Sequence, residues 1–371
     1  MIAPDVLIVG AGFAGATCAR ILADAGWRIV ICDQRDHIGG NAFDCHDTAG
    51  VLIHPYGPHI LHTENKHVQI FLSRFTDWRP YEHVVQARLR DGCLLPYPLN
   101  AETVFHLYGR HLDERGMRAF YAQQSTPIVN PQNLRDVLLS QIGEDLYELF
   151  FRGYTYKQWG CEPQDLDSSM GRRIPVRYNA DNRYFTDCFQ QMPANGYQSL
   201  FKHMLDHEHI ELRLQTPCTA ADVDHATQVI WTGPLDAFFE YCYGPLPYRS
   251  LRFEHEHLPD TVRYQPVATV NEVDRSVPYT RTTEFKHITG QQHTGTSIVR
   301  EYAQDTGDPY YPVPRTEPQI LADQYRKLAA QQSKVSFVGR LAEYRYYNMD
   351  QVVAAALRVS KRLITAKEWV C

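Results

Sequence analysis

The sequence predicts a mixed α/β fold that is built around a discontinuous Rossmann-like dinucleotide-binding domain. Three observations lead to this fold class. A strand, a glycine-rich turn, a helix and a second strand occupy residues 5–33, and a strand, a turn and a helix return at residues 335–363. Between these ends, a helical segment (100–152) is followed by a strand-rich segment (245–302). Since one parallel sheet can collect strands that are distant in sequence, we expect both ends to share it.

Composition narrows the class of protein. The chain has 371 residues, which fits two to three domains, and it is 44% apolar and 22% charged. These values exclude a disordered, collagen-like or coiled-coil protein. The net charge of −6 opposes non-specific binding to nucleic acid. An anionic ligand would therefore need a local basic site.

Three further features predict a cytoplasmic protein without a membrane span. No run approaches the ~20 apolar residues that cross a bilayer, and the N-terminus lacks the basic segment and cleavage site of a signal peptide. The nine cysteines are an odd number and form no CxxC pair. We therefore expect reduced thiols and no metal site built from them.

The first βαβ unit carries a dinucleotide-binding pattern. Residues 5–9 and 28–32 are predicted strands, and the sequence Gly10-Ala-Gly-Phe-Ala-Gly15 opens the helix between them. Asp33 follows the second strand at the spacing of the ribose-binding acid. The glycines let the backbone approach a pyrophosphate at the N-terminus of the helix, where unpaired N–H groups favour negative charge.

The segment after Asp33 favours FAD as the dinucleotide. Arg35 precedes Gly39, Gly40 and Asn41 in an RxxxGG pattern. In this position the pattern resembles FAD-binding flavoproteins of the glutathione-reductase and amine-oxidase type, and plain NAD dehydrogenases usually lack it. The sequence therefore predicts FAD.

Residues 51–63 contain three histidines. His54, His59 and His62 have no fixed helical spacing, and two prolines interrupt the segment, so a metal site is only weakly indicated. A backbone loop against the cofactor is the better interpretation.

The middle of the chain predicts one clear helix and several strands. Asn133–Arg152 has apolar residues at helical spacing, with Asn100 and Pro131 as start signals for helices. Residues 227–233 are expected to form a strand of the first sheet, and residues 245–302 antiparallel strands.

A second strand–turn–helix lies at the C-terminal end. Residues 335–340 predict a strand that ends in Gly339-Arg340. Asn348 with Gln351 three residues later resembles a capping box, and the helix that it opens is expected to reach about Leu363. The start of this helix is placed to stabilise negative charge on an isoalloxazine ring.

Several longer motifs resemble one family. They are FFRGYTYKQWG (150–160), GRRIPVRYNADNRYF (171–185), VPYTRTTE (277–284), PYYP (309–312) and GRLAEYRYYNMD (339–350), together with GAGFAG and HIGGNAFD near the N-terminus. With these motifs the sequence resembles bacterial UDP-galactopyranose mutases over nearly its whole length. These flavoenzymes are isomerases that interconvert UDP-galactopyranose and UDP-galactofuranose. The reaction has no net redox change, yet the flavin must be reduced.

The resemblance implies three domains, with the substrate in a cleft between them beside the isoalloxazine. It also implies a homodimer, a role in polysaccharide biosynthesis, and a reductant such as NAD(P)H. The implied bounds are residues 1–70 with 185–235 and 331–371 for an FAD-binding domain, 84–180 for a helical domain, and 71–83 with 236–330 for a small antiparallel sheet domain.

A UDP-sugar brings two phosphates to an acidic chain and needs fixed cations, which guanidinium groups supply bidentately. By the resemblance, Arg173 and Arg281 bind the diphosphate, with Arg173 on a mobile loop at about residues 163–177. Arg172 and Arg183 are interpreted as solvated. His59 is placed near the flavin, either to assist a proton step or as a packed histidine.

The resemblance also implies the other site residues. Phe150 and Tyr154 would otherwise be core positions four residues apart on one helix. His83 stands where some relatives have asparagine. The substrate-binding set is His83, Phe150, Tyr154, Thr155, Gln158, Trp159, Tyr184, Asn271, Tyr311 and Tyr346. The cofactor-binding set is Gly10, Gly12, Phe13, Gly15, Asp33, Gln34, Gly39, Gly40, Asn41, His59, Ile60, Gly339, Arg340, Met349, Asp350 and Gln351.

The chain shows no motif for a side-chain nucleophile such as GxSxG, HExxH or a kinase loop. That fits a reaction in which the cofactor carries the hard chemistry. By the resemblance, N5 of reduced FAD attacks the anomeric carbon and UDP leaves. The ring then closes through the other oxygen and UDP returns.

Three alternatives stay open at the level of the sequence. One is an FAD oxidoreductase of the amine-oxidase or desaturase kind, which the arginines and aromatic residues after residue 150 oppose. Another is a mutase for a different nucleotide sugar, such as UDP-N-acetylgalactosamine or a dTDP-sugar. The third is a non-catalytic flavin- or nucleotide-binding module, which the retention of Arg173 and Arg281 opposes.

Overall fold

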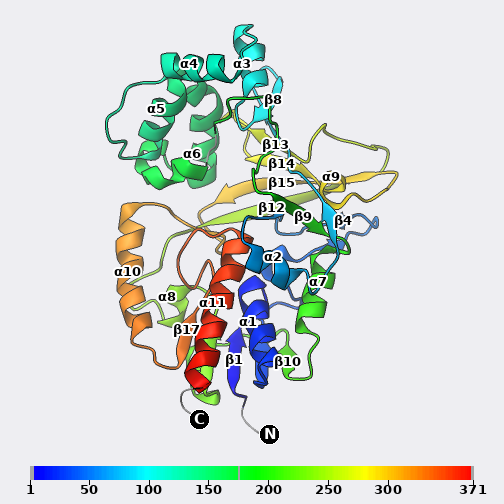
Figure 1. Ribbon diagram of the computed structural model, residues 1–371, viewed down its shortest axis with the longest axis vertical. Helices are drawn as coiled ribbons and strands as arrows, with labels where there is room; N and C mark the ends of the chain where they lie inside the picture. The colour runs from blue at the N-terminus through cyan, green and yellow to red at the C-terminus, as the bar shows by residue number, and fades with distance from the viewer. Residues whose placement is uncertain (1–3, 174–175, 369–371) are drawn as a thin grey trace.

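The computed structural model describes residues 4–173 and 176–368. Figure 1 shows a parallel sheet with flanking helices at the end of the molecule where both termini lie, a wide sheet across the middle, and a group of helices at the opposite end. The mixed α/β fold predicted from the sequence is confirmed, and it contains the expected Rossmann-like unit.

The parallel sheet combines strands from three distant parts of the chain. Its order is β10-β2-β1-β11-β17, and every neighbouring pair is parallel. The bounds are Val6–Val9 (β1), Ile29–Cys32 (β2), Ile210–Arg213 (β10), Gln228–Trp231 (β11) and Val335–Phe337 (β17). Strands that are covered on both faces need continuous apolar runs, and the sequences VLIV and IVIC supply them. The expected sharing of one sheet by both ends of the chain is confirmed.

Two helices from opposite ends of the chain pack together on this sheet. They are α1 (Phe13–Asp24) and α11 (Met349–Glu368), which lie side by side in Figure 1. Small residues such as Ala16, Ala19 and Ala356 are fully buried between them and permit a close approach. The last helix runs to Glu368, five residues beyond the expected end at Leu363, because nothing in the sequence there breaks it.

The wide sheet has the order β16-β12-β15-β14-β13-β7-β8. It is antiparallel as expected, except that β13 and β7 pair in parallel. The bounds are Val85–Arg88 (β7), Leu94–Tyr97 (β8), Tyr248–Leu258 (β12), Thr269–Glu272 (β13), Arg281–Glu284 (β14), Thr296–Gln304 (β15) and Tyr311–Pro312 (β16). Strands β7 and β8 come from the segment 84–180 that was expected to form a helical domain, yet they complete this sheet.

The helical unit comprises α3 (Ala101–Tyr108), α4 (Glu114–Gln124), α5 (Leu134–Tyr147) and α6 (Gly153–Trp159). Asn100 caps α3 and Asn133 caps α5, each through its side-chain oxygen. The predicted single helix over Asn133–Arg152 is wrong in detail. Gly143 has a φ of +78° inside α5, and a π-helix over Glu148–Arg152 then leads into α6.

The remaining elements connect these units. A small sheet has the order β5-β9-β6, and β3 pairs with β4. The bounds are Cys45–His46 (β3), Leu52–Ile53 (β4), Leu61–Thr63 (β5), Lys66–Leu72 (α2), Trp78–Pro80 (β6), Phe189–Pro193 (β9), Gly196–Leu205 (α7), Leu235–Phe238 (α8), Phe285–Thr289 (α9) and Thr316–Ala330 (α10). In the part of the chain that is described, no helix has the length and apolar character to cross a membrane, and no disulfide is formed.

Candidate functional site

A cavity of about 440 Å³ opens at the carboxyl ends of β1, β2 and β11. In parallel sheets this edge is where ligands bind. Most of the predicted cofactor-binding residues line the cavity: Gly10, Gly12, Phe13, Asp33, Gln34, Gly39, Gly40, Asn41, His59, Gly339, Arg340 and Met349. The other predicted residues, Gly15, Ile60, Asp350 and Gln351, do not line it.

The glycines of the first turn each meet a different steric demand. Gly10 has a φ of +101°, and a Cβ there would lie 2.0 Å from Thr232 Oγ1. A Cβ on Gly15 would lie 1.8 Å from the Gly10 carbonyl oxygen, so Gly15 supports the turn without touching a ligand. A Cβ on Gly12 would lie 3.6 Å from Gly40 Cα, so the two glycine backbones approach each other closely with no side chain between them. The backbone at the start of α1 is therefore bare, which suits a pyrophosphate.

The start of α1 offers unpaired donors. The helix has no side-chain cap at Gly12 and no acidic residue in its first turn. Backbone N–H groups in the first turn of a helix have no partner within the helix, and the helix dipole favours an anion there. The residues present thus fit the diphosphate of a dinucleotide.

Asp33 is fixed by the backbone around it. Its Oδ2 accepts a hydrogen bond from the amide of Ala11 (2.8 Å), and its Oδ1 accepts one from the amide of Arg35 (2.9 Å). A carboxylate can accept about four hydrogen bonds, so it keeps capacity for ribose hydroxyls at the cavity wall.

His59 lies in the wall of the cavity as a neutral imidazole. Its Nδ1 lies 2.9 Å from the carbonyl oxygen of Gly57, which can only accept, so Nδ1 carries the proton and Nε2 is free of it. Burial lowers the pKa of His59 to about 4, and the positive charge of Arg340 contributes to this shift. The prediction of a loop over residues 51–63 is correct only in part, because Leu52–Ile53 and Leu61–Thr63 are strands and His59 alone of the three histidines lines the cavity. The described residues hold no cluster of His, Cys, Asp or Glu able to bind a metal.

Arg340 connects the cavity to a cluster of aromatic rings. It lines the cavity, and its Nη2 and Nε donate to the carbonyl oxygen of Tyr347 at 2.6 and 3.1 Å. Its guanidinium carbon also lies 5.1 Å from the ring centroid of Tyr311 and 5.7 Å from that of Tyr346. Predicted cofactor-binding and predicted substrate-binding residues are therefore direct neighbours.

The aromatic cluster consists of Trp159, Tyr311 and Tyr346, from three separate parts of the chain. The two tyrosine rings stack with centroids 5.2 Å apart and planes at 17°. The ring centroid of Trp159 lies 6.3 Å from that of Tyr311 and 6.0 Å from that of Tyr346. Flat faces of this kind can bind a base or a sugar ring.

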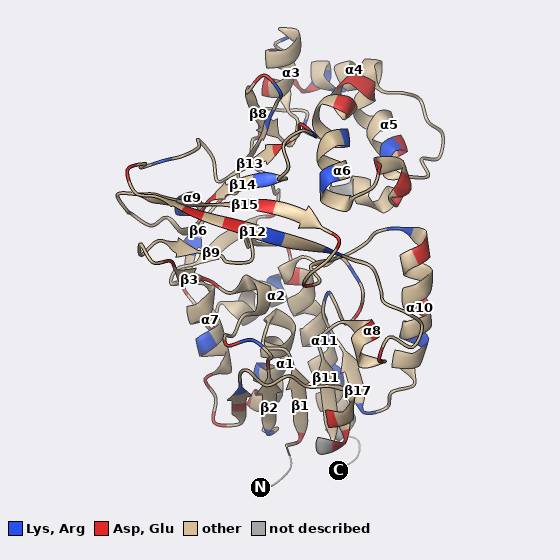
Figure 2. Cartoon of the chain, turned by 180° about the vertical axis from the view of Figure 1, so that it is seen from behind, with Lys and Arg blue, Asp and Glu red and all other residues tan. Residues whose placement is uncertain are grey.

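Arg281 is positioned by the register of the wide sheet. It pairs with Asn271 of β13 on one side and with Glu301 of β15 on the other, so the three side chains share one face. Its Nη2 donates to the hydroxyl of Tyr154 (2.6 Å), and its Nε lies 3.7 Å from Glu301 Oε2. Figure 2 shows the basic segment of β14 on the side that faces the basic segment of α6.

Buried acceptors without partners mark the same place. Gln158 Oε1, Asn271 Oδ1 and Glu301 Oε1 are buried, and none has a hydrogen-bond partner within the described chain. Buried polar atoms are usually paired, so a ligand with donor groups gives a physical reason for all three. The sequence prediction missed Glu301, since only the strand register brings it to this face.

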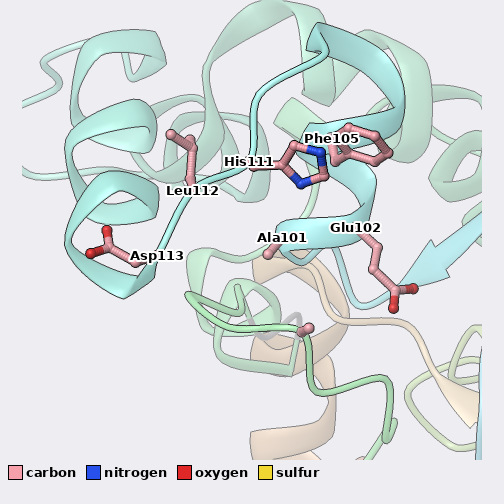
Figure 3. A pocket seen from close by; sticks show the side chains of 7 residues that line it. Ala101, Glu102, Phe105, His111, Leu112 and Asp113 are labelled. Carbon is pink, nitrogen blue, oxygen red and sulfur yellow. The ribbon is translucent and has the colours of Figure 1, made fainter.

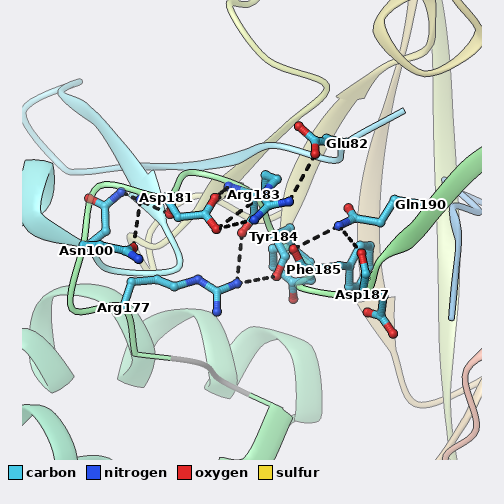
Figure 4. A network of polar contacts seen from close by, with 10 residues as sticks. Glu82, Asn100, Arg177, Asp181, Arg183, Tyr184, Phe185, Asp187 and Gln190 are labelled. Carbon is cyan, nitrogen blue, oxygen red and sulfur yellow. Dashed lines mark hydrogen bonds and ion pairs between the residues drawn. The ribbon is translucent and has the colours of Figure 1, made fainter. Parts of the chain in front are cut away.

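Tyr184 and His83 adjoin the arginine. The amide of Tyr184 donates to the carbonyl oxygen of His83 (2.7 Å), and the two rings lie 5.8 Å apart. Figure 4 shows how this segment is held: Arg177 donates to the carbonyl oxygens of Arg183 (3.1 Å) and Tyr184 (3.4 Å). Arg183 itself pairs with Asp181 and with Glu82. These pairings occupy Arg183, in line with its interpretation as a surface residue.

Three predicted site residues, Phe150, Thr155 and Arg173, make no described contact with the cavity or with the aromatic cluster. Phe150 is fully buried in the π-helix of the helical unit, and Thr155 on α6 is 5% exposed. The backbone of Arg173 ends a short 3-10 helix, but its side chain and residues 174–175 lie outside the described part of the structure.

The cavity wall also contains Arg35, the first residue of the RxxxGG pattern, and a loop that had no signal in the sequence. Arg35 lies over the ring of Tyr56 at 4.5 Å and donates to Asn41 Oδ1 at 2.9 Å. Thr216 and Thr219 enter the wall from the loop after β10, where the amide of Thr216 donates to the carbonyl oxygen of Asp33 (2.9 Å). No motif marks this return of the chain.

A second cavity, of about 380 Å³, lies in the helical unit between α3, α4 and the segment near Ala180 (Figure 3). The ring of His111 stacks on Phe105 at 3.9 Å in its wall. None of the predicted site residues lines it.

The fold and the first cavity define a protein with a Rossmann-like dinucleotide-binding domain. Residues 8–75 match the family described as NAD(P)-binding Rossmann-like domain, and residues 149–346 match the family described as UDP-galactopyranose mutase. The chain belongs to the UDP-galactopyranose mutase family, as its motifs predict. It is therefore an enzyme of the mutase kind.

Individual relatives agree with this assignment. The chain is 38% identical to a probable UDP-galactopyranose mutase from Klebsiella pneumoniae, over 98% of this chain and 95% of that one. It is 37% identical to a dTDP-fucopyranose mutase from Escherichia coli, over 97% and 98% of the two chains. A crystal structure of reduced UDP-galactopyranose mutase shares the fold with a TM-score of 0.77, at 15% identity over 98% and 96% of the two chains.

Two buried histidines predict a loss of stability in mild acid. Burial lowers the pKa of His54 and of His83 to about 3 from the usual 6.5, with His59 and Arg281 adding repulsion. Between pH 6.5 and 3 the unfolded chain binds protons that the folded chain does not, so the free energy of unfolding falls as the pH falls. We expect a loss on the order of 1 kcal/mol per histidine at pH 5.5, measured by denaturant unfolding.

His83→Asn tests this expectation. Asparagine cannot titrate. The free energy of unfolding should therefore fall less steeply between pH 7 and 5, by the contribution of one histidine. An unchanged slope would mean that His83 binds its proton over the same pH range in the folded protein as in the unfolded chain.

Proposed function

We propose that the protein interconverts UDP-galactopyranose and UDP-galactofuranose and that it acts with reduced FAD. The observation that carries the proposal is the adjacency of three groups in a member of this family: the dinucleotide cavity, the aromatic cluster around Trp159, and the Arg281–Tyr154 pair, with Arg340 between the first two.

The side chains have separate tasks in this proposal. Arg281, with Tyr154 and Asn271 beside it, binds the diphosphate and balances the charge that develops when UDP separates from the sugar. Trp159, Tyr311 and Tyr346 hold the substrate between the sheet and α6 and exclude water. Arg173 is proposed as the second diphosphate ligand on the strength of the resemblance alone.

The cofactor site fits FAD by its own chemistry. The bare backbone of Gly12 and Gly40 accommodates the pyrophosphate, and Asp33 accepts from the ribose. His59 and Arg340 are proposed to face the isoalloxazine end, where Arg340 supplies a positive charge. When bound and reduced, FAD supplies a nucleophile, its N5, to the anomeric carbon.

The test is conversion of UDP-galactofuranose under anaerobic conditions, followed by chromatography of the nucleotide sugars. Enzyme reduced once with dithionite should complete many turnovers, while oxidised enzyme should be inactive. Consumption of one reductant per product would instead indicate an oxidoreductase, and a protein that binds no FAD would refute the proposal.

A dTDP-sugar is the second candidate substrate, because the relative that acts on dTDP-fucopyranose, by its name, is almost as similar as the Klebsiella protein. The same assay with dTDP-fucopyranose distinguishes the two. A higher kcat/KM for the dTDP-sugar would reassign the substrate but not the reaction.

The organisation into three domains also stays a proposal. The pairing of β7 with β13, and of β8 with β7, supports counting these two strands with the wide sheet. The homodimer and a reductant such as NAD(P)H stay predictions of the resemblance, and the cytoplasmic location stays a prediction of the sequence.

Trp159→Ala should weaken UDP binding and leave flavin binding intact. Trp159 contacts the two tyrosines of the cluster but does not line the dinucleotide cavity. Stacking of a base on an aromatic ring contributes about 1–3 kcal/mol, so we expect a roughly five- to hundredfold higher Kd for UDP. Calorimetry with UDP and the flavin absorbance of the purified protein measure the two effects. Equal loss of both ligands would make Trp159 a scaffold residue.

A further inference from the structure

Helix α6 is short for the number of site residues that it carries. It spans only Gly153–Trp159, yet it presents Tyr154, Thr155, Gln158 and Trp159. It follows the π-helix Glu148–Arg152 without a side-chain cap at its start. A helix of two turns has little stability of its own, so tertiary contacts must fix its position.

Lys157 makes the strongest of these contacts. Its ammonium donates to three backbone carbonyl oxygens, those of Glu272 (2.6 Å), Asp274 (2.8 Å) and Tyr279 (2.9 Å). All three oxygens belong to the end of β13 and the turn that leads into β14. The same turn is followed directly by Arg281, so one ammonium ties α6 to the hairpin that carries Arg281.

Contacts at both ends of the helix support this attachment. A Cβ on Gly153 would lie 2.4 Å from the carbonyl oxygen of Val273, so the helix starts in tight contact with the same turn. At the other end, the buried Arg249 of β12 donates to the carbonyl oxygens of Gln158 (2.9 Å) and Lys157 (3.2 Å). These are unpaired carbonyls of the helix C-terminus, where a cation is favourable.

We propose that Lys157 is a positioning residue that sets the spacing between Tyr154 and Trp159 on α6 and Arg281 on β14. The inference rests on the proposed function, in which these side chains bind the diphosphate and the base of the substrate. The contact between Arg281 Nη2 and the Tyr154 hydroxyl spans 2.6 Å and depends on both elements being in place. Without the ammonium, three carbonyl oxygens lose a charge-assisted hydrogen bond and the turn is free to move away from the helix.

Lys157→Met tests the proposal, with Lys286→Met as a matched control. Lys286 on α9 makes the same kind of contact, to the carbonyl oxygens of Val262 (3.0 Å), His293 (2.5 Å) and Gly295 (2.8 Å), and it lines none of the cavities described above. Both variants should lose thermal stability. Only Lys157→Met should bind UDP at least tenfold more weakly, while its flavin content stays that of the wild type.

The wild-type protein offers a second measurement that needs no variant to fold. Burial lowers the pKa of Lys157 to about 8, and the negative charges of Glu272 and Asp274 oppose that shift. The charged groups around it are paired: Arg88 with Glu272, Arg90 with Asp274, and Arg249 at the end of the helix with Asp305. Between pH 7 and 9.5 the ammonium therefore becomes an amine with fewer donors, and the Kd for UDP should rise severalfold.

The outcomes distinguish a failure of the proposed function from a failure of the positioning role of Lys157. If the wild type binds no UDP, the proposed function fails. If the wild type binds UDP and Lys157→Met binds it equally well, only the positioning role is overturned. If Lys157→Met does not fold, the wild-type protein decides. A Kd for UDP that stays constant from pH 7 to 9.5 overturns the positioning role of Lys157, and a rise in this Kd supports it.

Discussion

Replacement of Arg281 by alanine should lower kcat/KM for the nucleotide sugar by about ten- to a hundredfold. Hydrogen bonds to charged groups contribute roughly 1.5–3 kcal/mol, and each 1.4 kcal/mol corresponds to a factor of about ten. The loss should be larger than for an exposed cation, because Arg281 is only 28% exposed and no other described arginine shares its row of the sheet. The loss should consist of both a lower kcat and a higher KM, because the diphosphate is bound before and during the reaction.

Two comparisons make this prediction specific. Arg300→Ala removes a cation from the adjacent strand but from the opposite face, where Arg300 pairs with Glu256 at 2.7 Å, and it should leave kcat/KM near the wild-type value. Arg281→Lys keeps the charge but loses the fork that matches phosphate oxygens, so it should recover only part of the activity. If Arg281→Ala and Arg300→Ala behaved alike, the diphosphate site would lie elsewhere.

The removal of Arg281 would also leave Glu301 without its counter-charge. Burial raises the pKa of Glu301, and Arg281 is the group that opposes this rise. In Arg281→Ala the carboxyl group should therefore take up a proton more readily. The double variant Arg281→Ala/Glu301→Gln should consequently be more stable than Arg281→Ala alone, although it should be no more active.

The dinucleotide-binding unit could be predicted because its signals are local. The strand, the turn from Gly10 to Gly15 and Asp33 lie within one stretch of the chain, and each residue type answers a steric or electrostatic need of that stretch. The return of β11 and β17 to the same sheet was also predictable, because buried parallel strands leave continuous apolar runs in the sequence.

The geometry around Arg281 could be predicted only in part. The motif VPYTRTTE predicted Arg281 as a site residue. Which residues lie beside it depends on the register of three strands, and no local sequence pattern predicts that register. The resemblance supplied Asn271, and nothing supplied Glu301. The same limit applies to the loop with Thr216 and Thr219, which reaches the cavity through the tertiary fold alone.

The break in α5 shows how tertiary contact overrides helix periodicity. The apolar residues of Asn133–Arg152 keep a helical spacing, so the pattern predicts one helix. Gly143 adopts a φ of +78° because the backbone of α4 passes there, and a Cβ would lie 2.1 Å from the carbonyl oxygen of Gln124. A single glycine within a periodic segment was the available signal, and its consequence depended on a neighbouring helix.

Gly12→Val should yield a folded protein that is largely free of flavin. Gly12 has φ and ψ of −81° and −169°, which valine adopts without strain. A Cβ there would lie 3.6 Å from Gly40 Cα, an ordinary contact, so the chain itself can accommodate it. The two methyl groups would instead cover the backbone N–H groups at the start of α1, where the pyrophosphate is proposed to bind. Loss of even two such contacts weakens binding more than a hundredfold, at roughly 1.5–3 kcal/mol each.

Gly15→Ala separates this effect from damage to the fold. Its Cβ would lie 1.8 Å from the Gly10 carbonyl oxygen, a backbone atom that cannot move aside cheaply, so we expect a loss of about 1–3 kcal/mol in the free energy of unfolding. Gly12→Val should instead unfold at the same temperature as wild-type protein from which the flavin has been removed. Flavin absorbance at the wild-type level in Gly12→Val would show that the dinucleotide does not approach the start of α1, and the assignment of the cavity would have to be abandoned.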